Sequence, residues 1–106
     1  MSPGALGDLD PVIHAPKRLA AVAVLFSSDQ VSFQFLKEHL GVADADLSKQ
    51  MSALEAAGYV KVHKTGRGRG SSTTYALTRD GRAAYRRHRA ALRALLGEDG
   101  TAPGAD

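Results

Sequence analysis

Cysteine and tryptophan are absent from the 106 residues, and phenylalanine and tyrosine occur only three times each. The lack of cysteine excludes a disulfide framework and any metal site built from thiolates. The longest apolar run, Leu19 to Phe26, has eight residues, whereas a helix needs roughly 20 to cross a bilayer. No secretory apolar segment follows Met1. We therefore expect a soluble, cytoplasmic protein that has no membrane partner.

Acidic residues are scarce in the second half of the chain. Ten of the fourteen lysines and arginines lie between Lys61 and Arg93, where Asp80 is the single acid. The first sixty residues hold four bases and seven acids. A one-sided basic block is typical of proteins that bind a polyanion, but it is also typical of a solvated, soluble surface. Charge alone leaves both interpretations open.

Apolar and capping patterns predict one folded domain over residues 10–96. The hydrophobic fraction of 43% is sufficient for a modest core in a chain of this length. We expect a flexible tail at residues 1–9 and a disordered tail at residues 97–106. Asp10-Pro11 is a helix-start signature and predicts a short helical turn. Pro16 then opens a nearly apolar helix that should end near Ser27.

Two short helices joined by a glycine turn follow. Val31 can form a very short strand, and Ser32 fits the N-cap of the first of these helices, which Gly41 should end. The next helix is expected over residues 44–57, and Gly58 should stop it. This arrangement predicts a helix-turn-helix.

Beyond residue 58 the apolar period changes from 3.6 to 2. Residues 59–64 alternate between apolar and polar, and residues 73–77 are rich in β-branched and aromatic side chains. They predict a hairpin whose tip is the basic loop 65–72, followed by a helix over 79–96 that Thr78 caps. The fold class is therefore mainly α with a small β-hairpin (α+β), a winged helix-turn-helix with an added C-terminal helix.

Several spaced motifs resemble one family. The run LGVADADLSKQMSALEAAGYVKVHK resembles the helix-turn-helix and first wing strand of MarR-like winged helix regulators. YALTRDGRAAY resembles their second wing strand and the start of their last helix, and LDPVIHAPKRLAAVAVL resembles the opening of a compact single-domain subgroup. The resemblance covers residues 9–96. It implies a transcription factor that dimerises and binds palindromic operators.

The helix over residues 44–57 departs from the family pattern at its start. The family usually has Ser or Thr where Ala43 stands, so we expect Asp44 to act as the N-cap instead. The family often has Gly-Asn where this chain has Ala45-Asp46. The carboxylate of Asp46 could accept a hydrogen bond from a cytosine amino group, or it could merely favour the positive end of the helix.

Helical spacing divides this helix into a buried and an exposed side. The core stripe consists of Leu47, Met51 and Leu54. Lys49 and Ser52 point the other way, and Ser48 flanks them. We expect Lys49 and Ser52 to contact bases or phosphates and Ser48 to contact a phosphate, although an ordinary solvated helix face would show the same pattern. Gln50 lies nearer the core and could brace the helix instead.

Further candidate contacts lie outside this helix. Ser32 and Gln34 begin the preceding helix, where free N–H groups can face a phosphate, although Ser32 also fits a plain capping role. Arg67 and Arg69 stand between glycines on the wing, which suits insertion into a narrow minor groove, and Lys64 would hold the adjacent phosphate. A flexible, soluble hairpin end is the alternative interpretation.

The last helix carries an apolar stripe that either packs inside the fold or pairs with a second subunit. We expect a homodimer in which this stripe takes part, because two-fold dimers read two half-sites. The stripe residues assigned to the dimer are Tyr85, His88, Leu92, Leu95 and Leu96. The four histidines are scattered, so we expect no metal and no cofactor.

The sequence thus predicts a DNA-binding transcriptional regulator that is not an enzyme, because no catalytic motif is present. Its helix 44–57 would enter the major groove and its wing 64–72 would lie on the minor groove and backbone. Two alternatives stay open. The domain could be a protein–protein interaction module without specific DNA binding. A small-molecule effector could also bind at the dimer interface and tune DNA binding.

Overall fold

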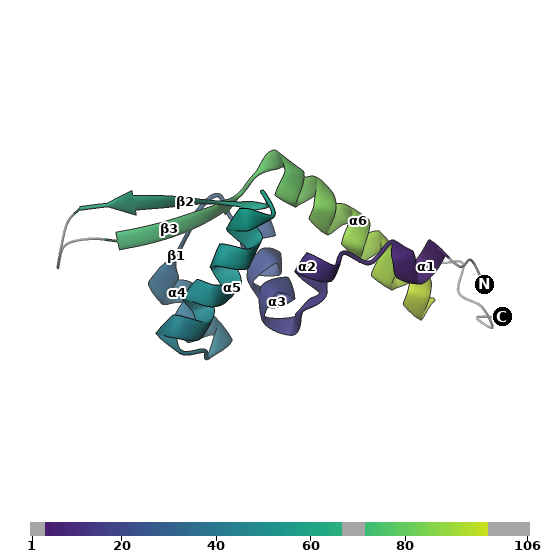
Figure 1. The fold of residues 1–106 in the computed structure, drawn as a ribbon, viewed down its shortest axis with the longest axis horizontal. Helices are drawn as coiled ribbons and strands as arrows, with labels where there is room; N and C mark the ends of the chain where they lie inside the picture. The colour runs from purple at the N-terminus through teal and green to yellow at the C-terminus, as the bar shows by residue number, and fades with distance from the viewer. Residues whose placement is uncertain (1–3, 67–71, 98–106) are drawn as a thin grey trace.

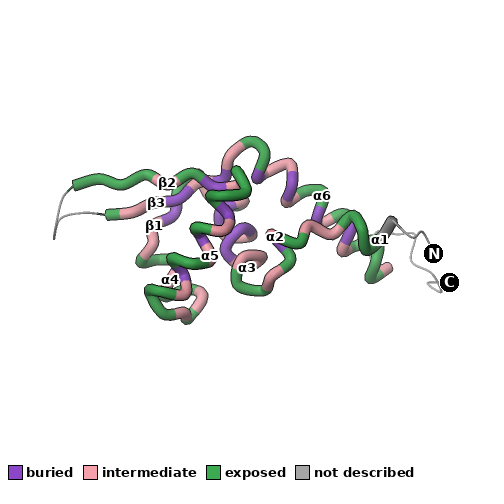
Figure 2. Tube along the Cα trace, viewed as in Figure 1, coloured by how far each residue is buried: buried purple, intermediate pink, exposed green. Residues whose placement is uncertain are grey.

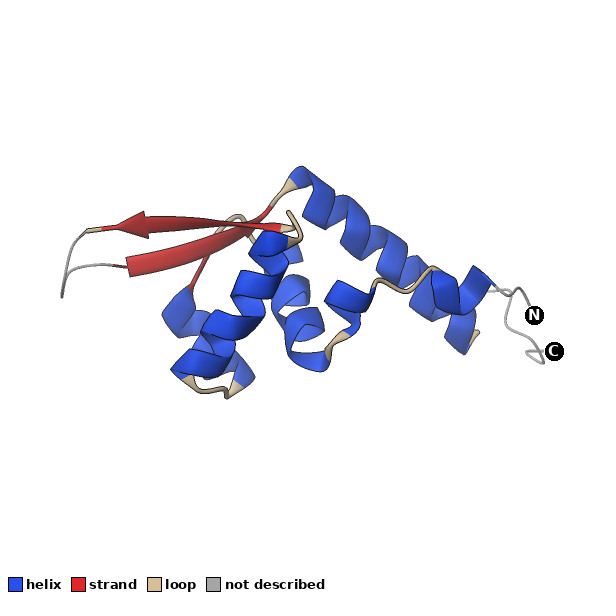
Figure 3. Cartoon of the chain, viewed as in Figure 1, coloured by secondary structure: helices blue, strands red, loops and turns tan. Residues whose placement is uncertain are grey.

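The computed structural model describes residues 4–66 and 72–97 (Figure 1). Six helices and three strands occur within these ranges, and Figure 3 shows that the helices dominate. In chain order they are α1 (Gly4–Gly7), α2 (Pro11–His14), α3 (Pro16–Phe26), β1 (Val31–Ser32), α4 (Phe33–Leu40), α5 (Asp44–Ala56), β2 (Val60–Thr65), β3 (Ser72–Leu77) and α6 (Arg79–Leu96). This confirms the predicted fold class, a winged helix-turn-helix with a C-terminal helix.

The three strands form one antiparallel sheet in the order β1-β3-β2. Tyr75 in the central strand pairs with Val31 on one side and with Val62 on the other. The hairpin of β2 and β3 extends beyond the helices at one end of the molecule, and both chain termini lie towards the other end (Figure 1). The wing and the C-terminal half of α6 are therefore held apart.

The core lies where α3, α4 and α5 meet the base of the sheet. Figure 2 shows the buried segments gathered in this region. Its fully covered aliphatic side chains have relative exposures of 0–1% and come from three helices, namely Val22, Leu25, Leu36, Leu47, Met51 and Leu54. The nearly apolar α3 is central because it contacts α2, α4, α5, α6 and β3. This explains why so little of its surface is polar.

Capping residues begin or end the helices at nearly the positions that the sequence predicts. The side chain of Ser32 accepts a hydrogen bond from the Phe35 amide, and the side chain of Thr78 accepts one from Gly81. Gly41 ends α4 at φ +67°, a left-handed conformation that costs glycine no steric penalty. Gly41 thereby forms the tight turn between α4 and α5.

Two expectations about local structure were wrong. Asp44 is the first residue of α5 and not its N-cap, because Ala43 occupies the cap position and offers no side-chain hydrogen bond. Residues 4–7, expected to lie in a flexible tail, form the helical turn α1, which contacts α6. Of the tail expected at residues 97–106, Gly97 is the C-cap of α6, and residues 98–106 lie outside the described residues, as does the wing tip at 67–71.

A polar junction, which is a group of hydrogen-bonded polar side chains, joins three segments that are distant in the sequence. His88 on α6 is fully buried, and its Nδ1 accepts a hydrogen bond from the Asp10 amide at 3.0 Å. The neutral ring therefore carries its proton on Nε2, which donates to Nδ1 of His14 at 3.3 Å. The carboxylate of Asp10 caps α2 and accepts a hydrogen bond from the Tyr59 hydroxyl at 2.6 Å.

Gly81 brings the start of α6 against the end of the helix-turn-helix. A Cβ atom at this position would lie 2.1 Å from the carbonyl oxygen of Tyr59. That oxygen also accepts a hydrogen bond from the Thr78 amide at 2.9 Å. One backbone contact thus joins two of the sequence motifs, Gly58-Tyr59-Val60 and Leu77-Thr78-Arg79-Asp80-Gly81.

Candidate nucleic-acid interface

The helix α5 presents a small, polar face to solvent. Ala45, Lys49, Ser52 and Ala56 are exposed, whereas the opposite stripe is buried in the core. Ser48, beside this face, is exposed as well. Short side chains let a helix approach the edges of bases closely, and the ammonium group of Lys49 adds one cation. The predicted division of this helix into two sides is confirmed.

Ser48, Ser52 and Lys64 converge on one hollow between α5 and the wing. It has a volume of about 200 Å³, and its lining also includes Glu55 and Tyr75. The sequence analysis did not single out Glu55. It stands three residues after Ser52 and seven after Ser48, a helical spacing that could have identified it. Burial, and to a lesser extent the charge of Glu55, raises the pKa of the Tyr75 hydroxyl.

Ser32 and Gln34 lie on the other side of the wing base. They line a second hollow of about 220 Å³ together with Ser72 and Thr73 of β3. The Ser32 hydroxyl caps α4, and the Gln34 side chain donates to Glu38 at 2.7 Å. The wing base is thus flanked by candidate phosphate contacts from α5 on one side and from α4 on the other.

The two acids in the first turn of α5 are both neutralised by lysines of other helices. Asp44 Oδ1 lies 2.9 Å from Lys37 Nζ, and Asp46 Oδ2 binds Lys17 Nζ. The hydrogen bonds from Lys17 and Gln50 lower the pKa of Asp46, and the hydrogen bond to Asp44 raises the pKa of Lys37. Each oxygen of Asp46 thus already has one partner within this chain, Lys17 on Oδ2 and Gln50 on Oδ1.

Gln50 braces α5 against the helices before it. Its amide donates to Asp46 Oδ1 at 3.0 Å, and its carbonyl oxygen accepts from Arg18 at 2.8 Å. Arg18 also donates to the backbone carbonyl of Val12 at 2.6 Å. The first turn of α5 is thereby tied to α3 and α2, a link that helical spacing suggested but whose partners lie about thirty residues away in sequence.

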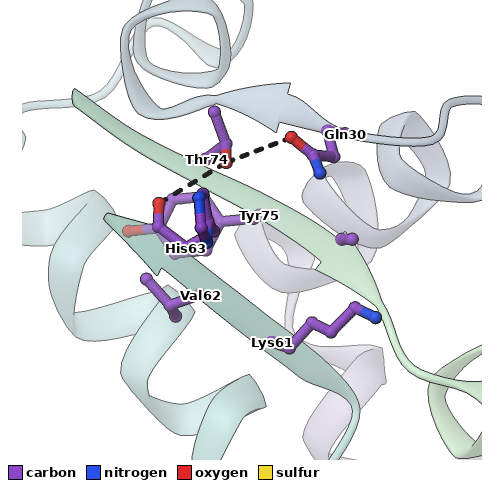
Figure 4. A pocket seen from close by; sticks show the side chains of 7 residues that line it. Gln30, Lys61, Val62, His63, Thr74 and Tyr75 are labelled. Carbon is purple, nitrogen blue, oxygen red and sulfur yellow. Dashed lines mark hydrogen bonds between the residues drawn. The ribbon is translucent and has the colours of Figure 1, made fainter. Parts of the chain in front are cut away.

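On the wing, Lys64 is exposed on β2, and Arg67 and Arg69 lie outside the described residues. The outer face of the sheet carries another hollow, of about 260 Å³ (Figure 4). The hydroxyl group of Thr74, which lines this hollow, lies 3.4 Å from Gln30 Oε1 and 3.4 Å from the His63 carbonyl oxygen. Lys61 also lines this hollow, on the face opposite to Val60 because side chains alternate along a strand.

Two of the five residues assigned to a dimer interface pack within their own chain instead. His88 is 0% exposed, so it offers no surface to a second copy, and its partners are Asp10 and His14. Tyr85 is half-buried, and its ring lies 4.9 Å from that of Phe26. The physical reason is that the first half of α6 packs on α2 and α3, which satisfies this part of the stripe.

The second half of α6 leaves apolar surface uncovered. Leu95 is 39% exposed and Leu96 is 63% exposed, whereas Leu92 is half-buried. Leu6 of α1, the helix that packs beside α6, is 63% exposed. Nearer the start of α6, the guanidinium groups of Arg82, Arg86 and Arg89 lie 5.4–5.8 Å from the centre of the Phe26 ring.

In the described ranges 4–66 and 72–97, no cluster of three or more His, Cys, Asp or Glu side chains is arranged to hold a metal ion. Over the same part of the chain, no helix has both the length and the apolar character required to cross a membrane.

A helix-turn-helix followed by a two-stranded wing defines a winged helix domain. The model of the winged helix DNA-binding domain family matches residues 17–96, so the chain belongs to this family. No curated protein sequence matched the chain.

Solved structures give the same fold. A transcriptional regulator homologue from Pyrococcus horikoshii OT3 has a TM-score of 0.75 and 24% identity, covering 80% of this chain and 84% of its own. The repressor CouR, bound to a 23-mer DNA duplex, has a TM-score of 0.63 and 24% identity over 91% of this chain and 72% of its own. NadR in complex with 4-hydroxyphenylacetate has a TM-score of 0.66 and 17% identity over 91% and 72%.

Other similar structures are described as MarR family and ArsR family regulators, so the fold is shared by both groups. The Pyrococcus horikoshii protein is described as a transcriptional regulator homologue and CouR as a transcriptional repressor. Family and fold together support a DNA-binding transcriptional regulator.

Proposed function

We propose that this chain is a MarR-like transcriptional regulator that acts in the cytoplasm, with α5 in the major groove and the wing on the minor groove and backbone. The observation that carries the proposal is the shared hollow in which Ser48 and Ser52 of α5 meet Lys64 of β2. A helix and a cationic hairpin that open on the same side can engage adjacent features of one duplex.

Within this arrangement, Lys49 and Ser52 contact base edges, and Ser48 and Lys64 contact phosphates. Ser32 and Gln34 contact the backbone from the start of α4, where the helix N-terminus also favours an anion. On the wing tip, Arg67 and Arg69 enter the minor groove.

We also propose that the protein is a homodimer on a palindromic operator. The uncovered leucines of the second half of α6, Leu92, Leu95 and Leu96, support this, together with Leu6 of α1. To read two half-sites, the two copies would have to present their recognition helices about 34–36 Å apart, one turn of DNA.

The DNA-binding part is tested by selecting bound sequences from a random duplex pool and then measuring affinity as a function of salt. Lys64→Gln should weaken binding and reduce the slope of log affinity against log salt by about 0.9, the value for one phosphate contact. Lys61→Gln is the matched control, because Lys61 lies on the same strand but lines the outer hollow. Equal slopes for the two variants would contradict the assigned role of Lys64.

A protein–protein interaction module is the second candidate function. The observation that favours it is the weak charge of α5, which carries Asp44, Asp46 and Glu55 against the single cation Lys49. This function predicts no retention on DNA at low salt and recovery of a stoichiometric protein partner from the native cell extract.

A small-molecule effector is a further part of the proposal. The support is the similarity of the fold to NadR, which was solved with 4-hydroxyphenylacetate. A thermal-shift screen with aromatic carboxylates tests it directly, since a ligand that binds only the folded state raises Tm.

A further inference from the structure

Two lysines reach the recognition helix α5 from other helices. Lys37 comes from the last turn of α4 and pairs with Asp44, and Lys17 comes from the first turn of α3 and pairs with Asp46. Both acids stand in the first turn of α5. Each lysine therefore lies beside the helix that is assigned to the major groove. Its ammonium group is paired with a carboxylate of that helix.

These ion pairs are accessible to solvent and readily exchanged. The side chains of Lys37 and Asp44 are 35% and 70% exposed, and those of Lys17 and Asp46 are 51% and 30% exposed. Exposed pairs of this kind contribute only about 0–1 kcal/mol to stability. A DNA phosphate is also an oxyanion and can take the place of the carboxylate as the partner of the ammonium group.

We propose that Asp44 binds Lys37, and Asp46 binds Lys17, in place of DNA phosphates. This pairing suppresses binding to DNA of arbitrary sequence. The proposal rests on the proposed function, because it requires α5 to be the helix that faces the duplex. When α5 is seated in its correct site, the lysines change partner from carboxylate to phosphate. On other sequences the lysines stay with the carboxylates, so those duplexes gain fewer phosphate contacts.

The two pairs differ in how firmly the carboxylate is fixed. Asp46 also accepts a hydrogen bond from Gln50, which Arg18 holds in turn. The carboxylate of Asp44 has no second partner among the described residues and is the more exposed of the two. The pair of Asp44 with Lys37 is therefore the clearer one to test.

The experiment is a double-mutant cycle on a duplex of random sequence, with affinity measured by fluorescence anisotropy over a range of salt. Asp44→Asn frees Lys37 and should raise the affinity about fivefold and steepen the salt slope by about one. Lys37→Gln alone should change little, because the lysine is already occupied. In the double variant the gain of Asp44→Asn should disappear. Affinity for the selected operator should rise at least as much, because Lys37 gives up Asp44 when the operator binds and the variant has no such pair to break.

The control Asp8→Asn makes the same change in formal charge near α1, remote from the wing (Figure 1). It should leave the salt slope unchanged. If Asp44→Asn raises affinity equally with and without Lys37, the carboxylate acts by simple repulsion and the proposal is overturned. It is also overturned if Asp44→Asn changes neither affinity nor slope.

The pair of Asp46 with Lys17 provides a second, independent cycle should a variant of the first pair fold poorly, as judged from its circular dichroism. Failure of the proposed function gives a different result from failure of this inference. A wild-type chain that binds no duplex at low salt refutes the proposed function, whereas a wild-type chain that binds, with variants that behave identically, refutes only the partner exchange.

Discussion

Replacement of Gly81 by alanine sets two effects of opposite sign against each other. In a helix, Gly→Ala normally stabilises a protein by up to about 1 kcal/mol, because alanine loses less backbone entropy on folding. Here the added Cβ would lie 2.1 Å from the Tyr59 carbonyl oxygen, at a distance that real Cβ atoms essentially never show. The obstacle is backbone and not the end of a flexible side chain, so the junction between α5, β2 and α6 has to move.

The magnitude follows from the contacts at this junction. Overpacking typically costs about 1–3 kcal/mol, and separation of Tyr59 from α6 also strains its hydrogen bond from Thr78, worth about 1 kcal/mol. After the gain in helix propensity, we expect a net loss of about 2 kcal/mol in the free energy of unfolding. For a domain of this size that corresponds to a fall in Tm of roughly 8–16 °C.

The assay is thermal and urea unfolding of Gly81→Ala beside Ala90→Gly. Ala90 is exposed on the same helix, so its variant measures the propensity effect without a clash and should lose about 1 kcal/mol. If Gly81→Ala is as stable as the wild type, or more so, helix propensity governs the site. The close approach of Tyr59 to α6 would then not constrain the fold.

Three further predictions concern the junction and the caps. Burial, and secondarily His14, lowers the pKa of His88, so its contribution to stability is fully present above the ordinary histidine pKa of about 6.5 and is lost as the pH falls below it. Urea unfolding at pH 7.5 and 5.5 should show this loss of stability. The variant His88→Asn keeps an acceptor for the Asp10 amide and should lose less stability between the two pH values. An equal loss in the variant would mean that another group causes the acid sensitivity. Tyr59→Phe removes the hydrogen bond to Asp10 and should cost about 1–2 kcal/mol in urea unfolding, whereas Tyr85→Phe, whose hydroxyl has no partner among the described residues, should cost less. Ala43→Ser supplies the missing N-cap of α5 and should raise the unfolding free energy by about 0.5–1 kcal/mol, and an unchanged Tm would speak against an available capping geometry.

Local chemistry explains which parts of the fold could be predicted. Capping and termination depend on a few neighbouring residues, so Ser32, Gly41 and Thr78 marked the helix ends closely. The two sides of α5 followed from helical spacing alone. The prediction of Asp44 as the N-cap failed for the opposite reason, because a chain can start a helix without a side-chain cap when tertiary contacts hold it.

The parts that could not be predicted depend on distant partners. Asp46 suggested base readout and Asp44 an N-cap, but their partners Lys17 and Lys37 come from other helices and are set by packing. His88 lay on an apolar stripe that fitted a dimer, and only its bond to Asp10, 78 residues away, shows that it belongs inside the chain. Spacing within one helix contains no information about which helix will cover it.

The hydrogen bond between Asp10 and His88 also affects the order in which the chain folds. It joins residues 78 positions apart, so it can form only after almost the whole chain has left the ribosome. The contacts among α3, α4 and α5 span much shorter separations and can assemble earlier. Closure of the polar junction between Asp10 and His88 is therefore a late event during synthesis, and it depends on the presence of α6.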